Sequence, residues 1–239
     1  TDKGRKEKQE LTSRRAKVLR PLRSSFERYG EVFVSLGVSF VPNFVSLYDE
    51  GVGDEGLYSE LTPPKSSGER WIGVAPFAKH KGKIYPLDRM EKVVSKLSEE
   101  SRVKIFLFGS GDREREILSL WRERYPGVIS LADKRYGFAV ELSLMSRLDV
   151  MISMDSANMH LASLVEVPVV SVWGATHPYC GFLGWRQSDS GVVELPLDCR
   201  PCSVFGNKPC YRKDYACLEI APETIVDRVK SLETLIKEK

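Results

Sequence analysis

The chain has 239 residues, of which 42% are hydrophobic and 29% charged, and its formal net charge of +3 is that of an ordinary soluble globular protein. No apolar run approaches the roughly 18 residues of a membrane span, and the first residues are charged, which argues against both an integral membrane protein and a secretory signal. Because the sequence begins with Thr1 rather than Met, we expect a fragment or processed chain. Because no secretory signal is found, we expect a cytoplasmic protein.

The first 25 residues form a basic arm, with nine lysines and arginines against three acids. Such an arm suits peripheral contact with an anionic membrane, and it equally suits a solvated helix face or linker. No RNA-binding signature accompanies the charges, so we expect no nucleic-acid partner. Reversing the charges of Arg14, Arg15 and Lys17 should abolish salt-sensitive vesicle binding if the arm contacts a membrane.

Residues 24–40 have the apolar spacing of one amphipathic helix that ends near Gly37. Residues 48–69 are rich in Gly, Pro and Ser, which predicts an irregular loop or linker. We therefore assign residues 1–69 to a lead-in of helix and linker, and residues 70–239 to a separate domain.

From residue 70 onward, short apolar runs alternate with amphipathic helical stretches. The expected strands are 71–77, 103–109, 127–132, 148–153, 167–174 and 191–196. The expected helices are 87–100, 112–125, 137–146, 156–166 and 221–239. This alternation is typical of βαβ units, and it predicts an α/β fold with a doubly wound, Rossmann-like parallel sheet.

Ligands of doubly wound sheets bind at the carboxyl ends of the strands, where helices begin and free backbone amides favour a phosphate. The first such turn contains Lys79, His80, Lys81 and Lys83. It is either a solvated basic loop or a phosphate-binding one. We expect replacement of Lys83 to weaken diphosphate binding with little effect on stability.

The second turn follows the strand at 103–109 and reads FGSGDREREI. Gly109 and Gly111 would let the backbone approach a ligand, and Asp112 could cap the next helix or accept hydrogen bonds from ribose hydroxyls. A Gly-x-Gly pattern is a weak signal, so helix capping and ribose binding both stay open here.

The third turn begins at Asp155 and Ser156, either of which could cap the helix 156–166 and leave its amides facing the cleft. His160 lies one helical turn from Ser156, on the same face. A lone histidine is more often structural. Its place beside a helix start, a lysine-rich loop and the turn at 174–178 favours a functional role.

Four of the five cysteines lie close together in the sequence, at Cys199, Cys202, Cys210 and Cys217. The CxxC pair suits a tetrahedral zinc site, but the spacing of the second pair is loose for one. We therefore favour free or partly paired thiols in a packed loop and expect no metal.

The stretch DSANMHLASLVEVPVVSVWGATHP, at 155–178, resembles the signature of glycosyltransferase family 9, the lipopolysaccharide heptosyltransferases. That signature is Asp, Ser or Thr, a small residue, two variable residues and His, followed after the next strand by a Gly-x-Thr-x-Pro turn. KHKGKIYP is similar to the family's lysine loop, and residues 199–229 resemble its Cys-rich segment and closing helix. The resemblance covers roughly residues 70–235.

The resemblance implies the second, donor-binding half of a bacterial GT-B glycosyltransferase, whose first domain would hold the acceptor and the catalytic base. It implies inverting transfer of a heptose from a nucleoside-diphosphate-sugar, ADP-heptose in the family, to a lipid-linked saccharide, with no cofactor or metal. The alternatives are another GT-B enzyme, such as a sugar-nucleotide epimerase, and a nucleotide-binding module without turnover.

Site roles carried over from the family follow the same motifs. The residues implied to be catalytic are Lys83, which would neutralise the leaving diphosphate, and Asp155, which would hold the donor sugar or neighbouring lysines. The residues implied to bind the donor are Glu114 or Glu116 at the ribose, Ser156, Ala157 and His160 at the phosphates, and Thr176 lining the sugar–phosphate pocket. Ala157 stands where many members of the family have Gly.

Overall fold

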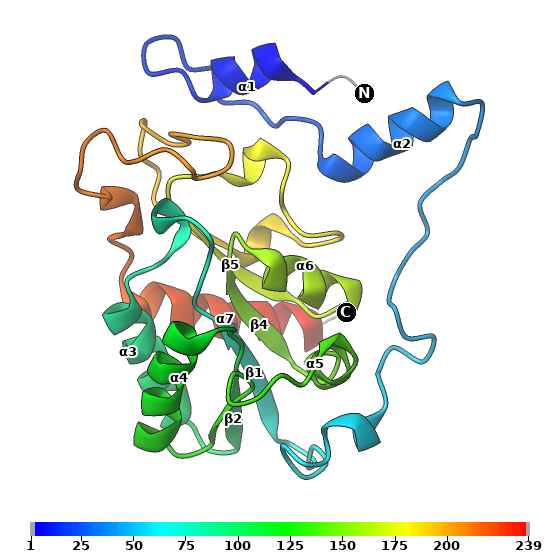
Figure 1. Cartoon of the computed structure of the whole chain (residues 1–239), viewed down its shortest axis with the longest axis vertical. Helices are drawn as coiled ribbons and strands as arrows, with labels where there is room; N and C mark the ends of the chain where they lie inside the picture. Colours follow the sequence, from blue (N-terminus) through cyan, green and yellow to red (C-terminus); the bar gives the residue numbers. More distant parts are fainter. Residues whose placement is uncertain (1–2, 238–239) are drawn as a thin grey trace.

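One parallel sheet of six strands forms the centre of the molecule (Figure 1). The structure, a computed structural model, describes residues 3–237. The strands are β1 (Arg70–Ala75), β2 (Val103–Leu107), β3 (Val128–Ser130), β4 (Val150–Met154), β5 (Val169–Trp173) and β6 (Val192–Glu194). Their order is β3-β2-β1-β4-β5-β6 with every pair parallel, which confirms the expected strands and the Rossmann-like sheet.

Helices cover both faces of the sheet and confirm the expected alternation. They are α3 (Leu87–Ser98), α4 (Asp112–Arg124), α5 (Phe138–Met145), α6 (Ala157–Leu164) and α7 (Pro222–Lys237). One hydrophobic cluster joins α3, α4 and α7 to one face, and a second joins α5 and α6 to the other. The last two residues of the expected closing helix lie outside the described residues.

The continuous apolar runs of the strands follow from burial on both faces. In β1, Ile72 and Val74 pack into the cluster under α3 and α7, while Trp71 and Ala75 pack into the cluster under α5 and α6. All four side chains are at most 1% exposed. A strand covered on both sides has no solvent-facing positions, so its sequence shows no polar alternation.

The order of the strands places a ligand crevice between β1 and β4. The chain runs outward from β1 through β2 and β3, and then crosses back to β4 on the other side of β1. The connection that follows β1 therefore crosses one face of the sheet, and the connection that follows β4 crosses the other face. This divergence opens a crevice at the carboxyl ends of the two strands. The lysine-rich turn follows β1, and Asp155 follows β4, so two of the three predicted turns face the same crevice.

The lead-in contains two helices, α1 (Arg5–Leu11), which the sequence did not predict, and α2 (Ser25–Ser35). The expected helix at 24–40 is confirmed as α2 but is shorter. It begins with a capping box between Ser24 and Glu27 and ends before Gly37, whose φ is 81°. Figure 1 shows both helices on the side of the molecule that holds the cysteine loop, residues 199–217.

The basic arm is packed against the rest of the chain. Leu11 is completely buried in a cluster with Cys180 and Val204. The Lys17 ammonium donates to the carbonyl oxygens of Cys199 and Pro201 at 3.1 and 3.0 Å. Lys17 is thus a structural contact to the cysteine loop, because its charge is held by carbonyls and is not available to a membrane surface.

Between α2 and β1 the chain forms an extended connection and the short 3-10 helix η1 (Glu55–Tyr58), which packs against α5. This agrees with the irregular linker expected at 48–69. Tyr58 is 1% exposed and joins the cluster beneath α5 and α6. Within residues 3–237, no helix combines the length and the apolar character that a membrane crossing requires.

Candidate functional site

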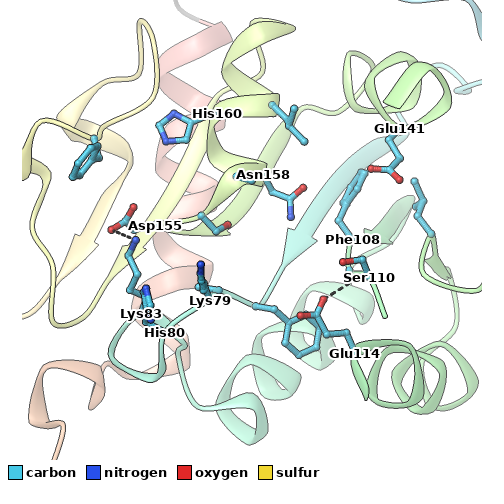
Figure 2. A pocket seen from close by; sticks show the side chains of 18 of the residues that line it. Lys79, His80, Lys83, Phe108, Ser110, Glu114, Glu141, Asp155, Asn158 and His160 are labelled. Carbon is cyan, nitrogen blue, oxygen red and sulfur yellow. Dashed lines mark hydrogen bonds and ion pairs between the residues drawn. The ribbon is translucent and has the colours of Figure 1, made fainter. Parts of the chain in front are cut away.

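A cleft of about 730 Å³ opens at the carboxyl ends of β1, β2 and β4 (Figure 2). It brings together most of the residues that the sequence singled out. Those that line it are Lys79, His80, Lys83, Glu114, Asp155, Ser156, Ala157 and His160. We call the part around Lys79, His80, Lys83, Asp155 and His160 the cationic end, and the part around Phe108, Phe138 and Glu141 the aromatic end.

An ion pair forms the centre of the cationic end. Lys83 Nζ lies 2.9 Å from Asp155 Oδ2, and their side chains are 14% and 5% exposed. The same carboxylate oxygen accepts a hydrogen bond from Thr176 Oγ1 at 2.8 Å. Lys83 is therefore held in one position and retains donors for a ligand in the cleft.

Thr176 does not line the cleft as the sequence predicted. It is fully buried behind Asp155, with no exposed surface. Because its hydroxyl donates to Asp155, its effect on a ligand can only be indirect, through the position of that carboxylate.

Two glycines bring the lysine loop against the end of β5. The amide of Ala175 donates to the carbonyl of Gly82 at 2.8 Å. A Cβ on Gly82 would lie 2.8 Å from the Cβ of Ala175, and a Cβ on Gly174 would lie 2.4 Å from the Gly82 carbonyl oxygen. Only glycine allows this approach, and it is this approach that places Lys83 next to Asp155.

Arg200 holds the turn that carries Thr176, and the sequence analysis missed it. Its guanidinium is 2% exposed and donates to backbone carbonyl oxygens and to the Glu194 carboxylate. The carbonyl acceptors are those of Trp173, Gly174, Thr176 and Leu195. An arginine between two cysteines of a loop gives no sign in the sequence that its side chain will fold back under β5.

The N-terminus of α6 faces the cleft between the two ends. Ser156 occupies the N-cap position of α6. The sequence predicted that the side chain of Asp155 or of Ser156 would cap this helix, but neither side chain does so. Asp155 is instead engaged by Lys83 and Thr176. Among residues 3–237, no side chain caps the first amides of α6, and a phosphate site requires such free amides.

His160 lies on the cleft side of α6, one turn from Ser156 (Figure 2). Burial lowers the pKa of its imidazole, with a smaller opposing effect from Asp155 and a further lowering from Lys83. Below its usual value of 6.5 the ring is neutral at pH 7, so it can offer one N–H to an oxygen of a ligand.

Glu114, rather than Glu116, lines the cleft. Its Oε2 accepts a hydrogen bond from the amide of Ser110 at 2.8 Å, which fixes the carboxylate at the end of β2 (Figure 2). Glu116 lies in a separate depression on the outer side of α4. Asp112 does not cap α4, which was one of the two roles left open for it, because the N-cap is Gly111 with φ 82° and Asp112 is the first helical residue.

The aromatic end contains groups that the sequence analysis did not single out. Phe108 directly follows β2. Phe138 and Glu141 lie three residues apart in the first turn of α5. Phe138 is 66% exposed, although its ring is large and apolar. Burial raises the pKa of the Glu141 carboxyl. An aromatic and an acidic residue at the start of a helix that follows a strand would have been the signal.

The cysteine loop forms packing contacts behind the cationic end. All five cysteines are free thiols, and among residues 3–237 no three His, Cys, Asp or Glu side chains are grouped to hold a metal ion. Cys202 Sγ donates to the carbonyl of Cys199, and burial raises the pKa of Cys217 to about 11. The four thiols of this loop are thus partly or fully buried packing groups.

A family model for glycosyltransferase family 9 (heptosyltransferase) matches residues 54–210. The chain is 25% identical over 172 residues to a lipooligosaccharide heptosyltransferase 2 of Campylobacter jejuni subsp. jejuni serotype O:6, covering 70% of this chain and 53% of that protein. A second Campylobacter jejuni protein of the same name, from serotype O:2, is 26% identical over 170 residues. The chain spans about half the length of the curated relatives it matches.

Solved structures of several glycosyltransferases have a fold similar to that of this chain. A family 9 glycosyl transferase from Veillonella parvula matches with a TM-score of 0.66 at 18% identity, over 89% of this chain and 60% of that one. The E. coli ADP-heptose heptosyltransferase II matches with a TM-score of 0.61 at 17% identity, over 82% and 56%. An E. coli heptosyltransferase with ADP-2-deoxy-2-fluoro heptose matches with a TM-score of 0.59 at 18% identity, over 91% and 59%.

Proposed function

The chain belongs to glycosyltransferase family 9, and from this membership and the geometry of the cleft we propose that it is the donor-binding half of a heptosyltransferase. In this proposal residues 70–239 bind a nucleoside-diphosphate-sugar, and residues 1–69 lead in from a preceding domain. The observation that carries the proposal is the buried Lys83–Asp155 pair beside the open N-terminus of α6.

The diphosphate is proposed to bind at the cationic end. Three favourable features meet there: the Lys83 ammonium, the free amides at Ser156 and Ala157, and the N–H of His160. Lys79 and His80 line the same part of the cleft and add further donors. Charge-assisted hydrogen bonds to phosphate oxygens are among the stronger polar contacts, and a helix N-terminus adds its dipole.

The ribose is proposed to bind beside Glu114. One oxygen of its carboxylate is fixed by the Ser110 amide, so the group is oriented before the ligand arrives. A carboxylate at the end of the second strand can accept hydrogen bonds from vicinal hydroxyls. The donor then extends along the cleft from Glu114 to Lys83, which is the order of groups in a nucleoside-diphosphate-sugar.

The proposed reaction is inverting transfer, in which an acceptor hydroxyl attacks the anomeric carbon and the nucleoside diphosphate leaves. Negative charge grows on the leaving diphosphate, and donors that already point at it lower the barrier. Lys83 is the main such donor, and Asp155 holds it in place, with Thr176 behind. The base that accepts the proton of the acceptor hydroxyl is proposed to lie in a preceding domain.

ADP-heptose is the proposed donor, and a lipid-linked saccharide the proposed acceptor. Support for the donor comes from the E. coli relative whose structure contains ADP-2-deoxy-2-fluoro heptose. Support for the acceptor comes from the relatives named as lipooligosaccharide heptosyltransferases. The proposal places the protein in the cytoplasm, where it needs no cofactor or metal.

Peripheral contact with an anionic membrane stays a proposal with a revised test. Lys17 is engaged by the cysteine loop, and Arg14 lies over the ring of Tyr211, so the expected charge-reversal set must change. Lys6 and Arg15 are exposed and are better suited to reversal. Salt-sensitive co-sedimentation with anionic vesicles, lost in a Lys6→Glu, Arg15→Glu variant, would support the proposal, and no binding at low salt would contradict it.

Isothermal titration of the chain tests the donor class. We expect ADP and ADP-heptose to bind, UDP and UDP-sugars to bind at least tenfold more weakly, and pyrophosphate to compete with ADP. Binding of UDP-sugars in preference to ADP-heptose would favour a different GT-B enzyme, such as a sugar-nucleotide epimerase. Absence of both nucleotide and pyrophosphate binding would overturn the proposal.

A nucleotide-binding module without turnover is the second candidate, and it is favoured by the binding features of the cleft itself, the uncapped N-terminus of α6 beside Lys83. In the donor-half proposal, residues 1–239 bind the donor but transfer no sugar alone. Adding the preceding domain should then restore transfer, whereas a pure binding module would stay inactive. Efficient transfer by residues 1–239 alone would contradict both.

A further inference from the structure

The aromatic end of the cleft contains an acid that the proposed chemistry does not use. Glu141 lines the cleft at α5, on the side away from Lys83 and Asp155 (Figure 2). Among the residues that the structure describes, it has neither a hydrogen-bond partner nor an ion-pair partner. Burial is the sole cause that raises the pKa of this carboxyl, so no cation compensates for it. A half-buried carboxyl without a partner is costly unless a ligand provides one.

An exposed aromatic ring lies on the same face of the same helix. Phe138 precedes Glu141 by three residues, so both side chains project from one side of α5. Phe138 is 66% exposed and lines the cleft, whereas Phe108, at 2% exposed, closes the cleft nearby. A flat ring open to solvent is a stacking surface, and base stacking on such rings is a common mode of nucleotide binding.

The order of the groups along the cleft places a nucleotide base at this end. The diphosphate is placed at Lys83 and the ribose at Glu114, and the next group outward along the nucleotide is the base. Glu114 and Glu141 lie toward the same side of the cleft, opposite Lys83 (Figure 2). A carboxylate is an acceptor, so it recognises an edge of a base that carries N–H groups.

We propose that Phe138 and Glu141 form the base subsite, in which an adenine stacks on Phe138 and its exocyclic amino group donates to the Glu141 carboxylate. This inference rests on the proposed donor-binding function, and it identifies the residues that would select the base of the nucleotide. Glu141 is then a specificity residue that distinguishes an amino-bearing purine from one that lacks the amino group. Phe138 contributes affinity without that distinction.

A structural role is the competing explanation for Glu141. An acid in the first turn of a helix interacts favourably with the helix dipole. Such a role would change the stability of the chain but not its relative affinity for two bases. The test therefore compares two nucleotides that differ by the amino group alone.

The experiment measures, by calorimetry on the whole chain, the affinities for ADP and for purine riboside 5′-diphosphate, which has hydrogen in place of the amino group. The wild type should bind ADP about tenfold more tightly, as expected for one hydrogen bond to a charged group. In Glu141→Ala the ratio should fall close to one, and Glu141→Gln, which keeps an acceptor oxygen, should retain part of it. Pyrophosphate affinity should be the same in all three.

Matched variants separate the base subsite from general effects. Glu116→Ala removes an exposed acid from the outer side of α4 and should keep the wild-type ratio. Phe138→Ala should weaken both nucleotides several-fold while keeping the ratio. Melting temperatures confirm that each variant is folded.

Four outcomes would overturn the inference. An unchanged ratio in Glu141→Ala, or a wild type that binds both nucleotides equally, ends the base subsite while leaving the donor proposal intact. A wild type that prefers UDP to ADP ends the assignment of an adenine. A wild type that binds neither ADP nor pyrophosphate ends the donor proposal together with the inference that rests on it.

Discussion

The two ends of the cleft differ in how their charged groups are held. At the cationic end, Lys83 is paired with Asp155, Asp155 accepts from Thr176, and the turn of Thr176 is fixed by Arg200. At the aromatic end, Glu141 has no partner among the described residues. The cationic end is thus preorganised by a network that also supports the fold. At the aromatic end, the Glu141 carboxyl would find its partner only in a bound ligand. Substitutions at the cationic end should therefore lower stability and affinity together, whereas those at the aromatic end should lower affinity without a loss of stability.

The largest effect should come from the support of the cationic end. Arg200→Met removes the donor of the carbonyls under β5 and leaves the Glu194 carboxylate with His177 alone, and we expect it to lower the free energy of unfolding by about 3–5 kcal/mol. Urea denaturation measures this. Arg212→Met removes an exposed arginine from the same loop and should change the urea midpoint little. Equal losses in the two variants would refute the role assigned to Arg200.

Next in size is the ion pair itself. Lys83→Met should weaken ADP and pyrophosphate binding by about 1.5–3 kcal/mol, the range for hydrogen bonds to charged groups. It should also lower stability, contrary to the sequence prediction, because Asp155 stays buried without its cation. Calorimetry and urea denaturation measure the two effects.

A double variant separates the two roles of Lys83. Lys83→Met combined with Asp155→Asn removes the uncompensated carboxylate, so stability should recover while diphosphate affinity stays low. Recovery of both would mean that Lys83 acts only on the fold, and the cationic end would lose its main donor.

A smaller effect should follow from the packing behind Lys83. Gly206 has φ +71°, and a Cβ there would lie 2.6 Å from Cγ of Lys83. Gly206→Ala should cost about 1 kcal/mol of backbone strain and also weaken pyrophosphate binding several-fold by displacing the lysine. Gly51→Ala, at φ +78° with no atom within 4 Å, is the control with strain alone. If both alanines leave pyrophosphate binding unchanged, the cysteine loop does not position Lys83.

The smallest effect concerns pH at the cationic end. Burial lowers the pKa of His160, so the folded state favours the neutral ring. The stability that follows is present above the usual pKa of 6.5 and is lost as the pH falls below it, with a slope of at most about 1.4 kcal/mol per pH unit. His160→Gln should flatten the fall in unfolding free energy between pH 7.5 and 5.5. If the fall in unfolding free energy between pH 7.5 and 5.5 is unchanged in this variant, a group other than His160 causes it.

The family motif and the fold could be predicted because their signals are local. The six strands follow from continuous apolar runs, and their parallel pairing follows from the helices between them. Lys83, Asp155 and His160 follow from their places at the ends of strands, which a doubly wound sheet brings to one edge. The division at residue 69, the roles of these residues and the donor stay predictions.

Other parts of the site depend on contacts between segments far apart in the sequence. Thr176 was expected in the cleft, but Asp155 lies in front of it. Helix capping was one role considered for each of the two turn acids, yet Asp155 pairs with Lys83, and a glycine takes the cap position before Asp112. For Asp155 the local capping rule failed because its partners, Lys83 and Thr176, are far away in sequence but close in space.

The sequence by itself determined the sheet, the helices between its strands, and the strand ends at which a ligand would bind, because hydrophobic periodicity depends on neighbouring residues only. The tertiary structure alone decided which of Glu114 and Glu116 faces the cleft and that Arg200 fixes the turn of Thr176. It also decided that Glu141 has no partner within the described part of the chain. Those outcomes depend on the directions in which side chains leave packed helices and loops. Such directions are set by packing across the whole domain, so no short stretch of sequence contains them.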